Sequence, residues 1–336
     1  VAFDPELYKL CAQRMVLEAG VDLYMNACLT GCRAEIGAIS QVIIHSKNGA
    51  EAIGAKVFID CTGDGDLAHL AGVPEQPRDL PLQPLTTYFI LSGVDTESEL
   101  IKTAMHHNRQ GVNCHCLPIR EKLLELARKE ELPEFGGPWF STTLHKGSVA
   151  VNITRAEADA CDNRDYTRAE ARLREDVFLL AGILRRHFPE FADSYVSTVA
   201  TQAGIRETRR FRGAHTISAQ EYLSGFKYPD SVSRGAHPID IHASRGSSQR
   251  IRFLDQAAYV PYRALYAPGY PNLLFAGRCL SADREAFASL RVQASCMGTG
   301  QAAGVAAGQS AGGNVAVDAL DMGRLLARLR ELGAAV

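Results

Sequence analysis

Apolar and polar positions near the start of the chain predict one amphipathic helix. The run Asp4–Glu6 is a typical helix start, because aspartate is a good N-cap, proline suits the first turn, and an acid lies near the positive helix end. The apolar positions that then share one helical face are Leu7, Leu10, Cys11 and Met15. Gly20 favours the end of this helix.

Alternating positions further along predict strands. Residues 21–25 are typical of a strand, and alternation follows at residues 29–36 and 41–46. The Asn-Gly pair at residues 48–49 is a strong hairpin signal, and it leads into an apolar strand that ends at residues 56–60. We therefore expect a small antiparallel meander that feeds a buried strand.

The middle of the chain shows a different pattern, with one apolar strand and three charged amphipathic helices. The strand is expected at residues 86–94, and the helices at residues 97–108, 119–131 and 167–187. A final strand at residues 270–278 and a last long helix at residues 290–310 follow. This order predicts a discontinuous α/β nucleotide-binding domain that is interrupted by a mixed α+β insert.

Composition and charge exclude several classes of function. The chain has 336 residues and a formal net charge of −2, which gives no reason to expect nucleic acid or an anionic membrane as partner. The longest low-charge segment, residues 292–317, is too polar to enter a bilayer, and the opening residues resemble no signal peptide. Nine cysteines without a CxxC pair favour small buried thiols over a zinc or iron–sulfur site. We therefore expect a soluble, cytoplasmic protein that binds no metal.

A tight turn follows the buried strand, within residues 59–74. The small residues in the Thr-Gly-Asp-Gly-Asp run allow the chain to turn sharply and a ligand to approach the backbone. Asp64 and Asp66 can accept hydrogen bonds from a ribose, or they can cap the helix expected near Leu67. Spacing favours capping and leaves ligand contact open.

Residues 272–308 place three glycines on one face of a helix. Gly300, Gly304 and Gly308 recur at four-residue spacing, although a glycine costs a helix roughly 1 kcal/mol relative to alanine. We therefore expect a sheet or a flat ligand to approach this face closely. The helix start also offers free N–H groups to an anion, and Arg291 is suitably placed to add a full positive charge there.

Four separated segments together resemble one known family. They are residues 55–74, residues 202–218, residues 235–242 with 259–265, and residues 272–308. They resemble the FAD-dependent oxidoreductases of the glutathione-reductase-like flavoproteins, a family that includes relatives of heterodisulfide reductase. Because they occur in order and span nearly the whole chain, they are more specific than any single glycine motif.

The resemblance implies an α/β fold with FAD as cofactor. An incomplete Rossmann-like FAD-binding domain with a β-meander, residues 1–84 and 266–336, would be interrupted by a mixed α+β substrate domain at residues 85–265. The residues implied at the ADP half of FAD are Thr62, Gly63 and Asp64, with the backbone of Cys28 at the adenine. Those implied at the pyrophosphate and ribityl are Gly277 and Arg278, and those at the isoalloxazine are Arg291, Val292 and Gln293.

The chain departs from the family pattern in two places. The family ordinarily opens with a strand–turn–helix unit that carries GxGxxG, and no such motif precedes the first helix here. We therefore expect the phosphate-binding unit to be absent from this chain, which would remove the main pyrophosphate contacts. Arg284 stands where relatives more often carry histidine, and arginine cannot replace histidine as a base.

Candidates for the reacting centre lie in two of these segments. Arg206, Arg209 and Arg210 can bind a substrate carboxylate or phosphate, or they can pair with nearby acids as a structural network.

Acid–base chemistry is expected from a second group of side chains, which are His237, Asp240 and His242. In a strand Asp240 and His242 share a face, so that Asp240 can orient His242. Surface histidines without a catalytic role are commoner, and that interpretation stays open. Tyr262 and Arg263 are weaker candidates.

The resemblance implies hydride transfer between a small organic substrate and flavin N5. A redox partner protein is a further candidate partner. Two alternatives stay open: a flavin subunit of an iron–sulfur electron-transfer complex, and a truncated fragment without FAD and without activity.

Overall fold

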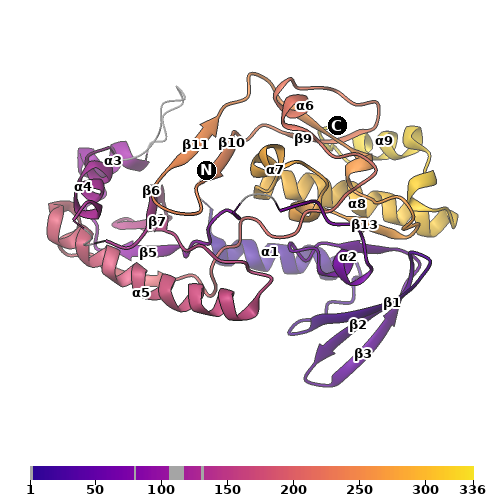
Figure 1. The fold of residues 1–336 in the computed structure, drawn as a ribbon, viewed down its shortest axis with the longest axis horizontal. Helices are drawn as coiled ribbons and strands as arrows, with labels where there is room; N and C mark the ends of the chain where they lie inside the picture. Colours follow the sequence, from indigo (N-terminus) through magenta and orange to yellow (C-terminus); the bar gives the residue numbers. More distant parts are fainter. Residues whose placement is uncertain (1–2, 79–80, 106–116, 130–131) are drawn as a thin grey trace. The chain divides into compact units, whose positions relative to one another are not determined.

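The computed structural model describes residues 3–78, 81–105, 117–129 and 132–336, and it has a mixed α/β fold (Figure 1). The chain forms two compact units. Unit 1 consists of Val1–Leu23, Leu80–Arg206 and His242–Gln249, and unit 2 consists of Tyr24–Asp79, Glu207–Ile241 and Arg250–Val336. The domain boundaries predicted at residues 84 and 265 stay predictions.

Unit 1 is built on a four-stranded antiparallel sheet in the order β6-β7-β5-β8. Its strands are β5 (Phe89–Ser92), β6 (Phe135–Thr142), β7 (Ser148–Thr154) and β8 (Tyr195–Val199). Its internal helices are α3 (Glu99–Met105), α4 (Leu117–Ala127) and α5 (Asn163–His187). The strand predicted at residues 86–94 and the helices predicted at residues 97–108 and 119–131 are confirmed with different bounds. Residues 106–108 and 130–131 of these predictions lie outside the described ranges.

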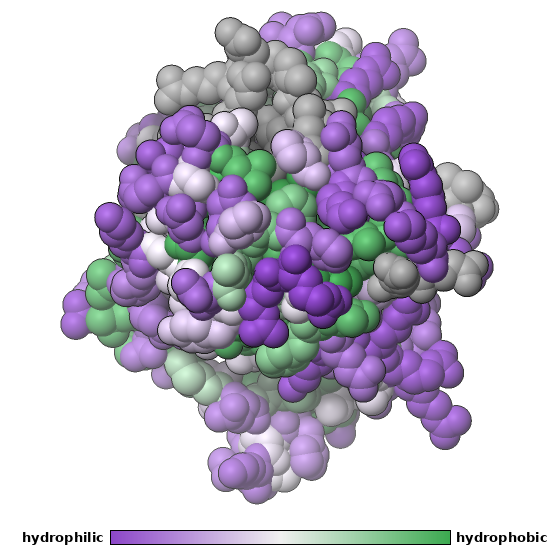
Figure 2. All heavy atoms as spheres, turned by 90° about the vertical axis from the view of Figure 1, so that its left-hand side faces the viewer, coloured by the Kyte–Doolittle hydropathy of each residue, from purple (hydrophilic) through white to green (hydrophobic). Residues whose placement is uncertain are grey.

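The longest helix, α5, confirms the helix predicted at residues 167–187 and begins earlier, at Asn163. Asp162 caps it, because its carboxylate accepts from the backbone N–H groups of the first turn. Val177 and Leu184 are fully buried and belong to the same apolar core as Phe89 of the sheet. The face of the molecule that carries α3, α4 and α5 is mostly hydrophilic, with apolar side chains interspersed (Figure 2).

The first helix, α1 (Pro5–Glu18), forms as the sequence predicts, with Asp4 accepting from the N–H groups of Glu6 and Leu7 at 2.8 and 3.1 Å. None of its residues is buried. The strand predicted at residues 21–25 was wrong: this segment carries no strand hydrogen bonding and its apolar side chains are exposed. An alternating pattern becomes a strand only where a neighbouring strand supplies hydrogen-bond partners.

Unit 2 contains the predicted meander. Its strands β1 (Cys28–Glu35), β2 (Ala38–Ser46) and β3 (Gly49–Gly54) pair antiparallel in that order. Asn272 ties the meander to the rest of unit 2, because its amide accepts from the N–H of Ile39 at 2.9 Å and donates to the Ile39 carbonyl at 2.7 Å.

Two short parallel strands form the centre of unit 2. They are β4 (Phe58–Asp60) and β13 (Leu273–Phe275), and they confirm the buried strand and the final strand that the sequence predicts. The last long helix, predicted at residues 290–310, is confirmed as α8 (Gln293–Gly313). The sequence did not predict the shorter α7 (Arg284–Leu290), which is separated from α8 by the extended conformation of Val292. The parallel strand pair places both carboxyl ends side by side, which is where α/β proteins bind ligands.

The remaining elements are short. The helices are α2 (Asp66–Leu70), α6 (Ala219–Leu223) and α9 (Met322–Glu331). The strands β9 (Ser231–Gly235) and β12 (Ala258–Pro261) form one antiparallel pair, and β10 (Ile239–His242) and β11 (Gln249–Arg252) form another two-stranded sheet. Within the described ranges, no helix combines the length and apolarity needed to cross a bilayer.

Candidate functional site

The end of β4 is organised by one buried carboxylate, Asp60, which is 1% exposed. Its Oδ1 accepts from the backbone N–H of Thr62 at 3.0 Å and from the Thr62 hydroxyl at 2.7 Å. Its Oδ2 accepts from the backbone N–H of Ala68 at 2.8 Å, at the first turn of α2. The Thr62 hydroxyl in turn accepts from the N–H of Asp66 at 2.9 Å. The turn after β4 is therefore fixed by Asp60 and Thr62.

Asp64 and Asp66 do not cap α2, so the capping role that spacing favours was wrong. The N-cap position is Gly65, without a side-chain cap, and Asp60 and Thr62 bind the free N–H groups instead. Gly63 and Gly65 both have positive φ values, of 85° and 68°. A methyl group at Gly65 would collide with the Phe211 ring, so only glycine fits there.

Asp64 and Asp66 instead bind arginines of the same unit. Oδ1 of Asp64 lies 3.0 Å from Nη1 of Arg278 and accepts from the Thr208 hydroxyl at 2.8 Å. Oδ1 of Asp66 accepts from Nη1 of Arg209 at 2.8 Å. Arg278 follows β13, so its pair with Asp64 joins the two loops at the carboxyl ends of the parallel strands.

The start of α8 approaches these loops. The backbone N–H of Gly277 donates to the Thr299 hydroxyl at 3.0 Å, and a methyl group at Gly277 would lie 3.7 Å from Sγ of Cys296. Burial raises the pKa of the Cys296 thiol, against the opposing effect of Arg278 and Arg291. The same region therefore brings together three predicted cofactor residues, Gly277, Arg278 and Arg291.

Arg291 is a largely buried cation of this region. Its side chain is 13% exposed, and burial lowers the pKa of its guanidinium, while Asp240 and Glu207 oppose this shift. Nη2 donates to the Asp240 carbonyl at 3.2 Å. Among the described residues, Nε of Arg291 has no hydrogen-bond partner. A buried N–H without a partner is costly, so this group fits an acceptor oxygen supplied by a ligand.

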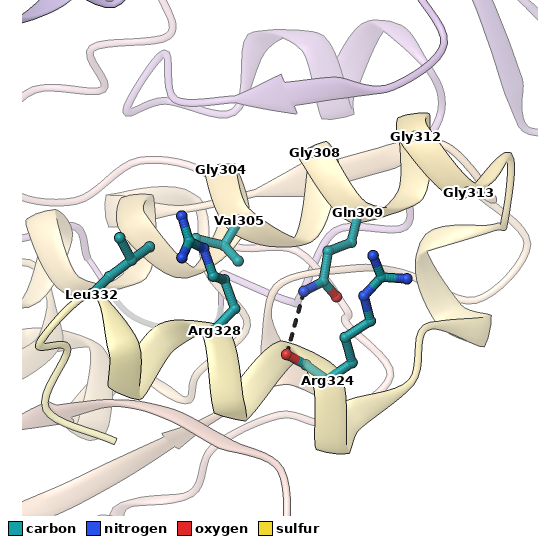
Figure 3. Close-up of a pocket in the computed structure, with 9 residues that line it drawn as sticks. All are labelled: Gly304, Val305, Gly308, Gln309, Gly312, Gly313, Arg324, Arg328 and Leu332. Atoms are coloured by element: carbon teal, nitrogen blue, oxygen red, sulfur yellow. Dashed lines mark hydrogen bonds between the residues drawn. The ribbon is translucent and has the colours of Figure 1, made fainter.

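The glycine face of α8 is open in the described part of the chain. No described atom lies within 4 Å of a methyl group placed at Gly300, Gly304 or Gly308, so the close sheet packing that the sequence allows is not formed there. The close approach occurs instead at Gly298, where a methyl group would collide with Ser233 of β9. Figure 3 shows the pocket of about 380 Å³ beside α8, into which Arg324 and Arg328 of α9 extend.

The other predicted cofactor residues lie at the start of a strand, at the start of a helix or in a loop. Cys28 is the exposed first residue of β1, Val292 is the N-cap of α8, and Gln293 is its first residue. Thr62 and Gly63 lie in the loop after β4. All nine predicted cofactor residues belong to unit 2.

The predicted arginine cluster is divided between the units. Arg206 belongs to unit 1, where Nη1 donates to the Pro84 carbonyl at 2.6 Å. Arg209 and Arg210 belong to unit 2. Nε of Arg210 lies 3.6 Å from Oε1 of Glu207, and burial lowers the pKa of Arg210. Arg284 also pairs with Glu207, at 3.4 Å. Each arginine thus has acceptors within the protein, as the structural interpretation of this motif expects.

The predicted acid–base residues are also divided. His237 and Asp240 belong to unit 2, and His242 belongs to unit 1. His237 Nδ1 lies 2.7 Å from the Pro238 carbonyl, and Asp240 lies 4.0 Å from Arg291. His242 is 5% exposed, and its Nδ1 contacts Nη2 of Arg155 at 3.0 Å. The guanidinium of Arg155 therefore binds Nδ1 of His242, and an orienting role of Asp240 stays a prediction.

Only some of the described cysteines are buried, although the sequence predicts small buried thiols. Of those described, Cys279 is buried, whereas Cys11, Cys28 and Cys61 are exposed, and Cys114 and Cys116 lie outside the described ranges. In the described part of the chain, no group of three or more His, Cys, Asp or Glu side chains is arranged to hold a metal ion.

A family model described as FAD dependent oxidoreductase matches residues 1–331. The chain belongs to this family. The match covers nearly the whole sequence, including every predicted site residue. No curated protein matches the chain significantly.

Solved structures share a distant likeness with this family member. A geranylgeranyl bacteriochlorophyll reductase-like protein from Thermoplasma acidophilum is 11% identical with a TM-score of 0.46, over 97% of this chain and 57% of that chain. A triple mutant of a flavin-dependent brominase is 9% identical with a TM-score of 0.43, over 96% of this chain and 59% of that chain. The chain thus spans less than two thirds of the length of either structure.

Sequence reasoning missed several residues that hold the predicted side chains, in unit 2 Asp60, Thr299 and Phe211 and in unit 1 Arg155. Asp60 carries a signal, because a single carboxylate that ends an apolar strand needs partners. Arg155 carries a similar one, as a charge directly after the apolar strand β7. Thr299 and Phe211 carry no signal in the sequence, because their contacts are with residues in distant segments of the chain.

Proposed function

We propose that this family member binds FAD in unit 2 and transfers a hydride between a small organic substrate and flavin N5. FAD would lie beside the loop Thr62–Asp64, the residues Gly277 and Arg278, and the start of α8. Bound there, FAD would supply a two-electron acceptor and donor. The family's dependence on FAD and the convergence of these three segments support the proposal.

The observation that carries the proposal is the buried, partly unsatisfied guanidinium of Arg291. Its Nε lacks a partner among the described residues, and it lies at the end of α7, directly before α8. A flavin ring offers carbonyl oxygens that accept hydrogen bonds, and negative charge develops on its pyrimidine edge when it is reduced. A fixed cation at that edge would stabilise the reduced form.

The open glycine face of α8 supports the same location. Gly300, Gly304 and Gly308 have free space where side chains would stand, which suits the close approach of a flat ligand. Gly63 supports it as well, because its positive φ disfavours a side chain and so leaves the backbone of this loop open to close approach. The substrate is taken to be a small organic molecule, and a redox partner protein stays a prediction.

The proposal is tested by titrating the purified chain with FAD and following flavin fluorescence. We expect saturable binding in the wild-type chain. Arg291→Met should weaken it by about tenfold to a hundredfold, since a hydrogen bond to a charged group contributes about 1.5–3 kcal/mol. Arg291→Lys should lose less, because it keeps the charge.

Arg330→Gln is the matched control, because Arg330 is an exposed arginine of α9. It should leave FAD affinity unchanged. Equal loss in both variants would show a general charge effect and overturn the role of Arg291. A wild-type chain that binds no FAD would favour the alternative of a fragment without cofactor.

A further inference from the structure

Two histidines of the GAHPIDIH segment form different hydrogen bonds at the same ring nitrogen. Nδ1 of His237 lies 2.7 Å from the carbonyl oxygen of Pro238. Nδ1 of His242 lies 3.0 Å from Nη2 of Arg155. A carbonyl can only accept a hydrogen bond and a guanidinium can only donate one. Each contact therefore determines whether Nδ1 of that ring carries a proton.

The contact with Arg155 requires a bare nitrogen on His242. Because the guanidinium is always protonated, Nδ1 of His242 must supply the lone pair. A ring with a bare Nδ1 is neutral and carries its only proton on Nε2. His242 is therefore a hydrogen-bond donor at Nε2, and it has no free lone pair with which to take up a proton.

The contact with Pro238 requires the opposite arrangement in His237. Its Nδ1 must carry the proton, so the neutral ring has a bare Nε2. The His237 backbone is fixed as well, because its carbonyl accepts from the Ser289 hydroxyl, which lies 2.8 Å from the Tyr222 hydroxyl. Of the two rings, His237 is the one able to act as a base.

Arg155 is held in a fixed position by several contacts. It is 1% exposed, and its Nη1 donates to the carbonyls of Gly246 and Ser248 at 3.0 and 2.8 Å. Gly136 lies against the guanidinium so closely that a methyl group there would collide with it. A cation with this many fixed contacts cannot move away from His242 without breaking them.

Other charged groups reach the loop after His242 without replacing Arg155. Arg120 donates to the Ser247 carbonyl at 3.0 Å, and Arg245 forms an ion pair with Glu157 at 2.5 Å. The Arg245 side chain is 79% exposed, so solvent screens this pair. Two arginines, Arg120 and Arg155, therefore hold the loop through its backbone carbonyls, and Arg155 also contacts the histidine ring.

We propose that Arg155 is a positioning residue that fixes His242 as a neutral Nε2–H donor, which leaves His237 as the base of this segment. The roles of the two rings in hydride transfer rest on the proposed function. Their tautomers are properties of the folded chain and can be measured without FAD or turnover.

The test is a nitrogen-15 NMR spectrum of the histidine rings in the full chain. His242→Gln and His237→Gln assign the two sets of signals by their loss. We expect the proton on Nε2 in His242, and on Nδ1 in neutral His237. A wild-type His242 ring that carries its proton on Nδ1, or that is doubly protonated near neutral pH, would overturn the proposal.

Substitution of Arg155 tests its role directly. In Arg155→Met the ratio of doubly protonated to neutral His242 near pH 6 should rise by about tenfold. The reason is that a neighbouring cation makes protonation of a histidine ring roughly tenfold less favourable. Arg155→Lys keeps the charge and should keep the neutral ring. An unchanged ratio in a folded Met variant would contradict the proposal, and if that variant does not fold, the wild-type spectrum and the Lys variant still decide.

Discussion

Nη1 of Arg278 lies 3.0 Å from Oδ1 of Asp64, and this ion pair joins the loops that follow the two parallel strands β4 and β13. Both side chains are about one-fifth exposed, at 20% and 21%. A pair in this setting holds the two strand ends together without the full desolvation cost of a deeply buried pair.

A double-mutant cycle measures the strength of this pair. Arg278→Gln and Asp64→Asn should each lower the free energy of unfolding, and the double variant should lose less than their sum, with a coupling of about 1 kcal/mol. Urea unfolding of the four proteins gives these values. Strict additivity would mean that the two loops are held by other contacts, such as the Thr208 hydroxyl on Asp64.

Gly65 should tolerate no side chain. Its φ of 68° is unfavourable for other residues, and a methyl group would collide with the buried ring of Phe211. We expect Gly65→Ala to destabilise the protein by about 2–4 kcal/mol, from backbone strain and overpacking together. Thermal unfolding is the measurement.

Gly300→Ala is the matched comparison for Gly65→Ala. Gly300 is helical and has nothing within 4 Å, so alanine should stabilise α8 by up to about 1 kcal/mol. Destabilisation of the chain by Gly300→Ala in the absence of FAD would show that this face of α8 is not open.

Asp176 in α5 should make the stability of the protein depend on pH. Burial raises the pKa of its carboxyl from 3.8 to about 6, against the attraction of Arg172. Because the folded-state pKa lies above the unfolded value of about 3.9, the folded state binds the proton more tightly. The stability contributed by the protonated carboxyl is complete below about pH 4 and is lost as pH rises through about 6.

Asp176→Asn removes this ionisation. The variant should exceed the wild type by about 1–2 kcal/mol at pH 8 and by much less at pH 4.5, in urea unfolding at both values. Asp193→Asn, at an exposed position of the same unit, should show no such pH-dependent gain. A gain of equal size at the two pH values would rule out the titration of Asp176 as its cause.

Asp60→Asn tests the turn after β4. An amide keeps one acceptor oxygen and places an NH₂ group where Asp60 now accepts from Thr62 or Ala68. We expect a loss of about 2–4 kcal/mol, because N–H groups that face the amide lose their acceptor in a buried place. Asp22→Asn, at an exposed position, should be nearly neutral, and a neutral Asp60→Asn would contradict the central role of Asp60.

The local elements could be predicted from the sequence where a local cause exists. Asp4 and the apolar spacing after it predict α1, and the Asn48-Gly49 turn predicts the meander. The strand at residues 21–25 failed because a strand depends on a neighbour, which its own residues do not reveal. The short helix α7 was missed because seven residues are too few to show a clear helical period.

The sequence indicated which residues form the candidate site, but it did not indicate which of them contact one another. The resemblance placed Thr62, Asp64 and Arg278 in one region, and the ion pair between the last two is consistent with that placement. It did not predict that Asp66 binds Arg209 or that Arg155 binds His242, because each contact joins segments more than 80 residues apart. Such contacts depend on the packing of whole elements.

The central claim is that FAD lies in unit 2 at the carboxyl ends of β4 and β13, and hydrogen–deuterium exchange with and without FAD tests it most directly. We predict that saturating FAD slows exchange in the peptides that contain Thr62–Asp64, Gly277–Arg278 and the start of α8. Saturable FAD binding that leaves these three segments unchanged and protects only segments of unit 1 would contradict the account.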